Sequence, residues 1–227
     1  LSLGKRPAHP QCSLNCFDSR LEHAELVCGK PQHMQGIGMS RFGGDGLLVK
    51  PRRRREVAGA QTPFAIILGC SDSRVPAEIV FDQGLGDLFV IRVAGNIVAP
   101  SQVGSVEFCA ARFGTRLVVV LGHSQCGAVE ATLEELRRPS SEQSHNIAAI
   151  VDRIRPSVQS LLDTPLANDN HALLHHAMRS NVRVSANHLR HGSVVLEQLI
   201  QNDGLLVIGA EYSLETGVVD FFDGLPE

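Results

Sequence analysis

The chain has 227 residues, and its 21 Lys and Arg against 24 Asp and Glu give a net charge of −3. This balance excludes a broadly basic nucleic-acid-binding protein, and a hydrophobic content of 43% excludes a disordered or collagen-like chain. The six cysteines are too few and too unevenly spaced for a small domain held together by disulfides, so metal binding or catalysis is their favoured use.

Residues 1–56 differ from the remainder of the chain in their weak hydrophobic periodicity. They hold three of the six cysteines and the arginine run 52–55. We expect a partly helical or irregular N-terminal arm, with a helix over 18–26 and a glycine-rich loop or extended segment over 36–46. The four arginines are predicted to form a solvated helix start.

The cysteines of this arm leave a second zinc site open as a hypothesis. Cys12 and Cys16 are four residues apart, and Cys28, His9 and His23 lie nearby in the sequence. Their spacing is irregular and their flanks resemble loops, which disfavours such a site.

From Phe64 onward, short β-branched runs alternate with amphipathic segments, a pattern typical of parallel strands joined by helices. The predicted strands are 64–68, 88–93, 117–121 and 205–208, followed by an antiparallel edge strand over 217–222. The predicted helices are 77–81, 103–113 and a long helical stretch broken at Pro139, Pro156 and Pro165. Together they predict one α/β domain over 57–227, with about four parallel strands plus the antiparallel edge strand in a central sheet flanked by helices.

No segment of the sequence has the length of a membrane span. Apolar stretches such as 117–121 fall far short of the roughly 20 residues required, and residues 1–7 lack the apolar core of a secretory signal. We therefore expect a soluble, cytoplasmic protein that binds neither membranes nor nucleic acid.

Polar residues follow two of the predicted strands at the points where these strands end. The first strand leads into Cys70, Asp72 and Arg74, and the third leads into His123 and Cys126. In open α/β sheets, ligands bind beyond the carboxyl ends of the strands, so these side chains are expected to converge. Two thiolates and one imidazole with an open fourth position form a catalytic zinc set. Asp72 could ligate the metal or stand beside it, held by a bidentate pair with Arg74.

Taken one at a time, these residues have simpler interpretations. A single cysteine after an apolar strand is usually a small core side chain, and Cys109, in a predicted helix, is interpreted in that way. Gly84 and Gly86 precede a strand and lack the third glycine of a dinucleotide-binding loop, which indicates a turn. The combination at the two strand ends is what favours a metal site.

Three ordered motifs carry a resemblance to a known family. Residues 70–76 (CSDSRVP), 86–96 (GDLFVIRVAGN) and 122–127 (GHSQCG) resemble the β-class carbonic anhydrases. The resemblance is close over 61–136 and looser over 209–219. It implies zinc bound by Cys70, His123 and Cys126, with Asp72 and Arg74 as a catalytic dyad.

The resemblance also implies a substrate pocket and an oligomer. Gln61 is expected to hydrogen-bond bicarbonate, and Phe89 and Phe108 are expected to form the walls of an apolar CO₂ pocket near a subunit interface. Because such pockets are built across chains, we expect a homodimer or a dimer of dimers.

The implied activity is that of a lyase, the reversible hydration of CO₂ to bicarbonate and a proton. Zinc lowers the pKa of its bound water toward about 7, and Asp72 would orient the resulting hydroxide. In a closed state of the site, Asp72 would instead become the fourth ligand. Arg92 and Tyr212 match a non-catalytic bicarbonate site of some family members, but Ile67 replaces their Trp, so we expect this regulatory pocket to be incomplete.

Three other functions remain open from the sequence. The same zinc site could hydrolyse carbonyl sulfide or carbon disulfide, although Gln61 and the complete run 72–76 favour CO₂. A metal-free thiol enzyme could use Cys70 or Cys126 as nucleophile with His123 as base. A zinc-stabilised binding protein without turnover is the remaining alternative.

Overall fold

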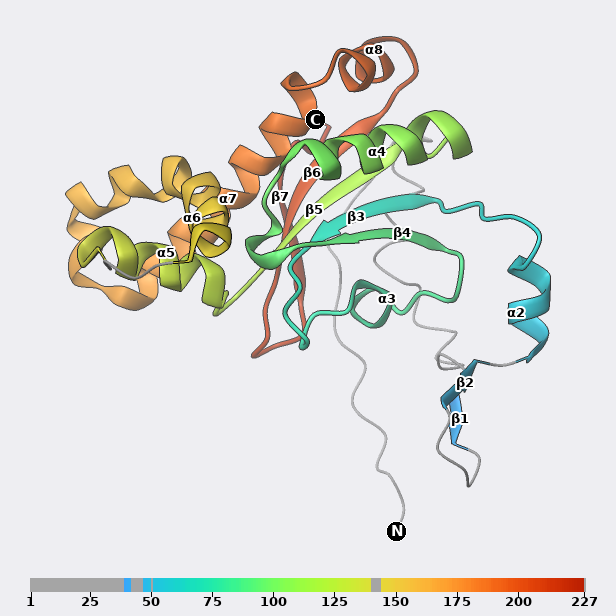
Figure 1. Cartoon of the computed structure of the whole chain (residues 1–227), viewed down its shortest axis with the longest axis horizontal. Helices are drawn as coiled ribbons and strands as arrows, with labels where there is room; N and C mark the ends of the chain where they lie inside the picture. The colour runs from blue at the N-terminus through green and yellow to red at the C-terminus, as the bar shows by residue number, and fades with distance from the viewer. Residues whose placement is uncertain (1–38, 42–46, 50, 140–143, 227) are drawn as a thin grey trace.

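The computed structural model describes residues 39–41, 47–49, 51–139 and 144–226 (Figure 1). The predicted helix over 18–26, most of the predicted loop over 36–46, and Cys12, Cys16 and Cys28 therefore lie outside the described residues. Within the arm, β1 (Met39–Arg41) and β2 (Leu47–Val49) form a short antiparallel pair that the sequence did not indicate. The predicted helix start at the arginine run is confirmed by α2 (Pro51–Val57), where residues 53–55 are exposed.

A five-stranded sheet forms the centre of the molecule, as predicted. Its strands are β3 (Ala65–Gly69), β4 (Leu88–Arg92), β5 (Leu117–His123), β6 (Leu206–Tyr212) and β7 (Val219–Asp223). The strand order is β4-β3-β5-β6-β7, with four parallel strands and β7 antiparallel at the edge. Every residue of β3 and β5 is buried, which explains their unbroken apolar runs.

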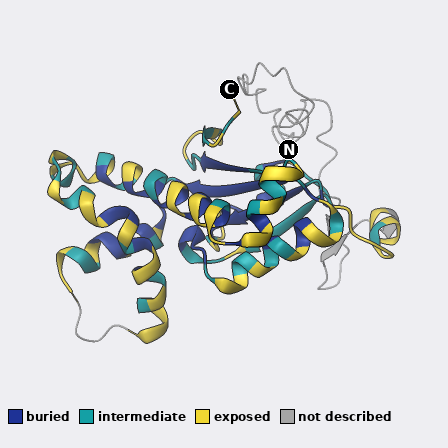
Figure 2. Cartoon of the chain, turned by 90° about the horizontal axis from the view of Figure 1, so that it is seen from above, coloured by how far each residue is buried: buried dark blue, intermediate teal, exposed yellow. Residues whose placement is uncertain are grey.

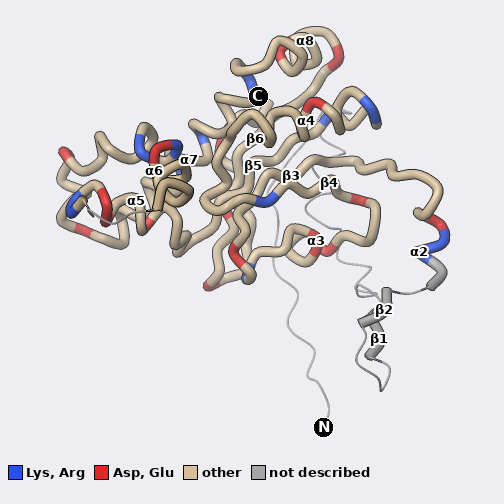
Figure 3. The backbone as a smooth tube through the Cα atoms, in the orientation of Figure 1, with Lys and Arg blue, Asp and Glu red and all other residues tan. Residues whose placement is uncertain are grey.

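Helices connect the strands and cover the sheet. They are α3 (Ala77–Val80), α4 (Pro100–Phe113), α5 (Gly127–Arg137), α6 (His145–Val158), α7 (Asn170–His191) and α8 (Val194–Asn202), with 3₁₀ turns η1 (Ala94–Asn96), η2 (Gln159–Asp163) and η3 (Pro165–Asn168). Helices α4, α7 and α8 bury one face of the sheet, α3 packs on the other, and α5 and α6 pack beyond its carboxyl edge. Figure 2 shows dark blue strands packed beside helices whose outer faces are largely exposed. Basic and acidic residues are interspersed over these elements (Figure 3). None of the described helices is long and apolar enough to cross a membrane.

The predicted break at Pro156 is wrong, because α6 continues through this residue and ends at Val158. A proline removes one backbone donor, but near a helix end the loss is small and tertiary contacts can outweigh it. The side chains of Ile154 and Val158 are fully buried on either side of Pro156, and Ser157 Oγ donates to the Ile154 carbonyl at 2.6 Å. The other two breaks are confirmed: α5 ends before Pro139, and η3 begins at Pro165.

Close packing of α7 against β5 depends on Gly122, the residue before His123. A Cβ atom at this position would lie 2.6 Å from both Met178 Sδ and Val182 Cγ2. We expect Gly122→Ala to lower the free energy of unfolding by about 1–3 kcal/mol, because the helix must shift to admit the methyl group. Urea unfolding measures the change.

The matched control for this variant is Gly104→Ala on α4. A Cβ atom there would meet nothing within 4 Å, so the substitution should raise the free energy of unfolding by about 0.5–1 kcal/mol. Equal urea midpoints for Gly122→Ala and Gly104→Ala would show that α7 can admit a methyl group at position 122 without loss of stability.

Candidate metal centre and catalytic site

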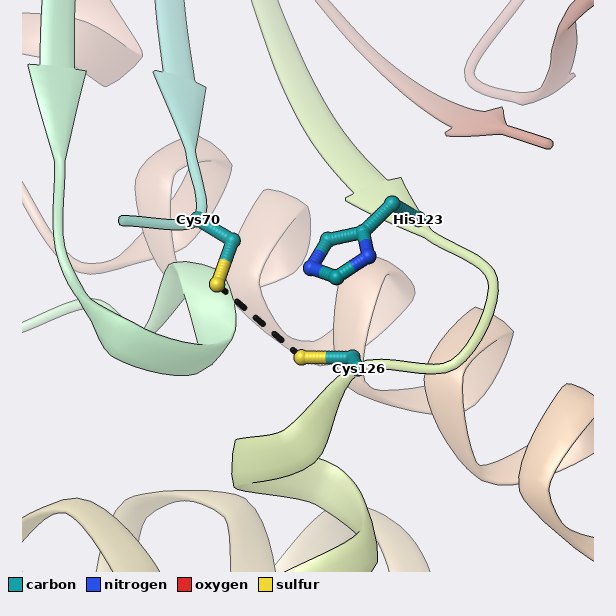
Figure 4. A group of neighbouring side chains, drawn as sticks. All are labelled: Cys70, His123 and Cys126. Carbon is teal, nitrogen blue, oxygen red and sulfur yellow. Dashed lines mark hydrogen bonds between the residues drawn. The ribbon is translucent and has the colours of Figure 1, made fainter. Parts of the chain in front are cut away.

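Three buried side chains meet at the carboxyl edge of the sheet (Figure 4). Cys70 follows β3 directly, His123 is the last residue of β5, and Cys126 is the N-cap of α5. The two sulfur atoms are 4.0 Å apart, and the ligand atoms of all three residues lie within 4.8 Å of one another. The predicted convergence of these strand ends therefore exists in the structure.

The geometry of this group fits a metal ion with tetrahedral sulfur and nitrogen ligands. Metal–sulfur bonds of about 2.3 Å at a tetrahedral angle place two sulfur atoms about 3.8 Å apart, close to the distance observed here. His123 Nδ1 lies 2.8 Å from the Ser124 carbonyl, to which it can donate, so Nε2 is left with its lone pair. No group of the described residues forms a hydrogen bond with this buried Nε2. A buried acceptor without a partner is costly, and a metal ion would satisfy it.

The surroundings of Cys70 favour its thiolate. Its hydrogen bond with the Cys126 thiol lowers the pKa of Cys70 to about 4, aided by His123 and by the Gly95 N–H group at 3.3 Å. The hydrogen bond with Cys70, together with burial and the neighbouring negative charge on Cys70, raises the pKa of Cys126. One thiolate therefore forms readily, and a bound cation would favour loss of the second proton.

Asp72 stands beside this group in a bidentate pair with Arg74. Arg74 Nε donates to Asp72 Oδ1 at 2.9 Å and Nη2 donates to Oδ2 at 2.7 Å, while the Arg74 backbone N–H also reaches Oδ1 at 2.9 Å. These bonds hold the pKa of Asp72 well below its usual range. Asp72 Oδ2 lies 3.9 Å from His123 Nε2, so an ionised carboxylate faces the metal group from one side.

The residues expected to line the substrate pocket do not lie at this site within one chain. Gln61 is exposed ahead of β3, at the opposite end of the strand from Cys70. Phe89 pairs with Ile66, about 13 Å along the strand from Cys70 at roughly 3.3 Å per residue. Phe89 and Phe108 form an aromatic cluster with Phe113, at centroid distances of 5.5–6.5 Å, and Phe108 is 53% exposed.

Arg92 has a role at this site that the sequence did not indicate. Its Nε donates to the Cys70 carbonyl at 2.9 Å and its Nη2 donates to the Asp72 carbonyl at 2.6 Å. Arg92 thus supports the backbone that carries Cys70 and Asp72. Its position at the end of β4, in register with Gly69, is the signal that could have revealed this role.

Ile67, where a bicarbonate pocket would need Trp, is fully buried in the core.

A mostly parallel sheet that brings two thiols and an imidazole together at its carboxyl edge defines an α/β protein with a buried group that could hold a metal ion. The sequence profile of the carbonic anhydrase family matches residues 65–219. The carbonic anhydrase of Mycolicibacterium smegmatis is 42% identical over 60% of this chain, and the alignment spans 59% of that protein. Carbonic anhydrase 2 of Mycobacterium tuberculosis is 34% identical over 85% of this chain and 84% of its own length.

Solved structures agree with this fold. The β-carbonic anhydrase of Aspergillus fumigatus has a TM-score of 0.69 at 24% identity, covering 78% of this chain and 83% of the other. One of two tetrameric β-carbonic anhydrases from Sordaria macrospora has a TM-score of 0.66 at 24% identity, covering 76% and 86%. The chain belongs to the β-carbonic anhydrase family, as the three motifs predicted.

Proposed function

We propose that this protein catalyses the reversible hydration of CO₂ to bicarbonate and a proton at a zinc ion held by Cys70, His123 and Cys126. One observation carries the proposal: the buried His123 Nε2, which has no hydrogen-bond partner among the described residues, lies beside two thiols and 3.9 Å from the Asp72 carboxylate. Membership of the family supports the reaction. Zinc accepts this donor set, and three protein ligands leave the fourth position open.

When bound, zinc supplies a Lewis acid that brings the pKa of a coordinated water toward about 7, so that a nucleophile is available at neutral pH. Asp72 then orients that nucleophile by accepting its hydrogen bond. Arg74 donates twice to Oδ1 but once to Oδ2, so Oδ2 keeps acceptor capacity on the side that faces His123. The low pKa of Asp72 keeps this acceptor ionised throughout the neutral range.

The arrangement of Asp72 corresponds to an open site in this proposal. To become the fourth ligand of a closed site, the carboxylate would have to give up its hydrogen bonds to the Arg74 side chain. The strength of this charge-assisted pair therefore favours the open form.

Gln61, Phe89 and Phe108 serve the catalytic site of a second copy of the chain in this proposal. Gln61 lies at the far end of β3 from Cys70, and Phe108 presents an exposed aromatic ring beside Phe89. An exposed aromatic cluster of this kind is typical of an interface between subunits. We therefore propose a homodimer or a dimer of dimers in which residues 57–227 form the catalytic unit and residues 1–56 the arm.

Metal analysis and stopped-flow CO₂ hydration of the same wild-type sample test this function. We expect one zinc per chain and hydration at about pH 7 and about pH 8.5, on either side of the pKa of zinc-bound water. Assays with carbonyl sulfide and carbon disulfide run in parallel.

Two results would contradict the proposal. Activity in a zinc-free sample would indicate the thiol enzyme. Zinc-loaded protein that is inactive toward CO₂ would indicate the sulfur substrates if it hydrolyses them, or a binding protein if it does not.

A further inference from the structure

Glu215, in the turn between β6 and β7, receives hydrogen bonds from the loop that joins the metal ligands His123 and Cys126. Ser124 Oγ donates to Glu215 Oε2 at 2.8 Å, and Gln125 Nε2 donates to Oε1. Ser213 Oγ, within the same turn, donates to Oε2 at 3.0 Å. The two loop residues and Glu215 are about 90 positions apart in the sequence, so this exposed carboxylate joins distant parts of the chain.

The loop that Glu215 contacts has a backbone conformation that needs support. Gln125 has φ of 56°, in the left-handed region that is unfavourable for a residue with a side chain. In this conformation its carbonyl accepts a hydrogen bond from Arg74 Nη2 at 3.3 Å. A strained residue persists only where its surroundings hold it, and the Gln125 side chain is held by Glu215.

Ser124 orients the histidine ligand through the same loop. Its carbonyl accepts from His123 Nδ1 at 2.8 Å, and its backbone N–H donates to the Tyr212 carbonyl at 3.0 Å. Its hydroxyl, which donates to Glu215, also accepts from the Leu214 N–H at 2.9 Å. Moving Ser124 would therefore turn the imidazole away from the metal position.

We propose that Glu215 is a positioning residue that fixes the loop between His123 and Cys126 for metal binding and the Gln125 carbonyl for contact with Arg74. The inference rests on the proposed function in one respect, the presence of a metal ion at the Cys–His–Cys group. The carboxylate acts through Ser124 and Gln125 and touches neither metal nor substrate. Groups that orient metal ligands typically change metal affinity or activity by about 10–100-fold when they are removed.

The chemistry of Glu215 indicates how it can be replaced. Its hydrogen bond from Ser124, with further donors nearby, lowers the pKa of the carboxyl to about 2, so it remains an acceptor at neutral pH. The hydrogen bonds from Ser124, Gln125 and Ser213 require acceptor atoms on residue 215 and do not require its negative charge. In Glu215→Gln, the amide oxygen can accept from both serines, and the Gln125 amide can turn so that its oxygen accepts from the new amide group.

Metal release tests the proposal directly. We compare Glu215→Ala and Glu215→Gln with the wild type by measuring the rate of zinc loss to excess EDTA and the visible absorption of the Co²⁺-substituted protein. Glu215→Ala should lose zinc about 10-fold faster and show an altered cobalt spectrum. Glu215→Gln should restore most of the wild-type values. Glu134→Ala, which removes an exposed carboxylate from α5, is the matched control and should change neither.

The outcomes separate this inference from the proposed function. Wild-type zinc release and an unchanged cobalt spectrum in Glu215→Ala would overturn the positioning role. Wild-type protein that holds zinc but does not hydrate CO₂ would overturn only the proposed function. Should Glu215→Ala fail to fold, Gln125→Ala removes the hydrogen bond between Gln125 and Glu215 and leaves the one from Ser124. This variant is also expected to speed zinc release, and release at the wild-type rate would contradict the proposal.

Discussion

Cys126→Ser is expected to abolish metal binding and, with it, CO₂ hydration. Cys126 is 1% exposed and its sulfur lies 4.0 Å from that of Cys70, within the buried group that would hold the metal. A serine hydroxyl does not lose its proton at neutral pH, whereas the thiolate supplies negative charge to the metal. Metal analysis of the purified variant and stopped-flow hydration measure the two losses.

Cys109→Ser is the matched control for this experiment. Cys109 is also fully buried, but it lies on α4 and its thiol contacts Thr115 Oγ1 at 3.5 Å. Burial raises the pKa of this thiol, as expected for a neutral core side chain. The control should keep its zinc and its activity. A Cys126→Ser variant that retained both zinc and hydration would place the metal elsewhere in the chain.

The strands were predictable because burial on both faces produces continuous apolar runs. The runs at 64–68 and 117–121 correspond to β3 and β5, shifted or extended by one or two residues. The extensions of these strands were not predictable, because the residues that form them do not continue the apolar run. Gly122 and His123 belong to β5 only because they pair with Glu211 and Tyr212 of β6. Such pairing depends on residues about 90 positions apart and leaves no local pattern.

The centre of the site was predictable for a topological reason. Parallel neighbouring strands end at the same edge, so Cys70 and His123 had to meet once β3 and β5 were adjacent. The spacing of Asp72 and Arg74 likewise allowed their pair. Chain order carries no information about side chains that meet across the fold, and Glu215 was therefore missed.

Arg74→Ala is expected to lower kcat/KM for CO₂ hydration by about 10–100-fold while zinc content stays at the wild-type value. The substitution removes the two side-chain hydrogen bonds of 2.7 and 2.9 Å that aim Asp72 at the metal group. It also lets the pKa of Asp72 rise toward its ordinary value of about 4, and because this remains far below pH 7, the carboxylate stays ionised in the assay. The expected loss is therefore one of orientation, not of charge.

Arg74→Lys distinguishes orientation from charge. A lysine keeps the positive charge near Asp72 but cannot form the two parallel hydrogen bonds of a guanidinium, so it should not restore activity. Arg112→Ala, at an exposed arginine of α4, is the control for removal of a positive charge and should keep wild-type kcat/KM. Recovery in Arg74→Lys would show that Arg74 acts as a point charge. Unchanged activity in Arg74→Ala would exclude an orienting role for the Arg74 side chain, because Asp72 would then need no guanidinium to hold it toward the nucleophile.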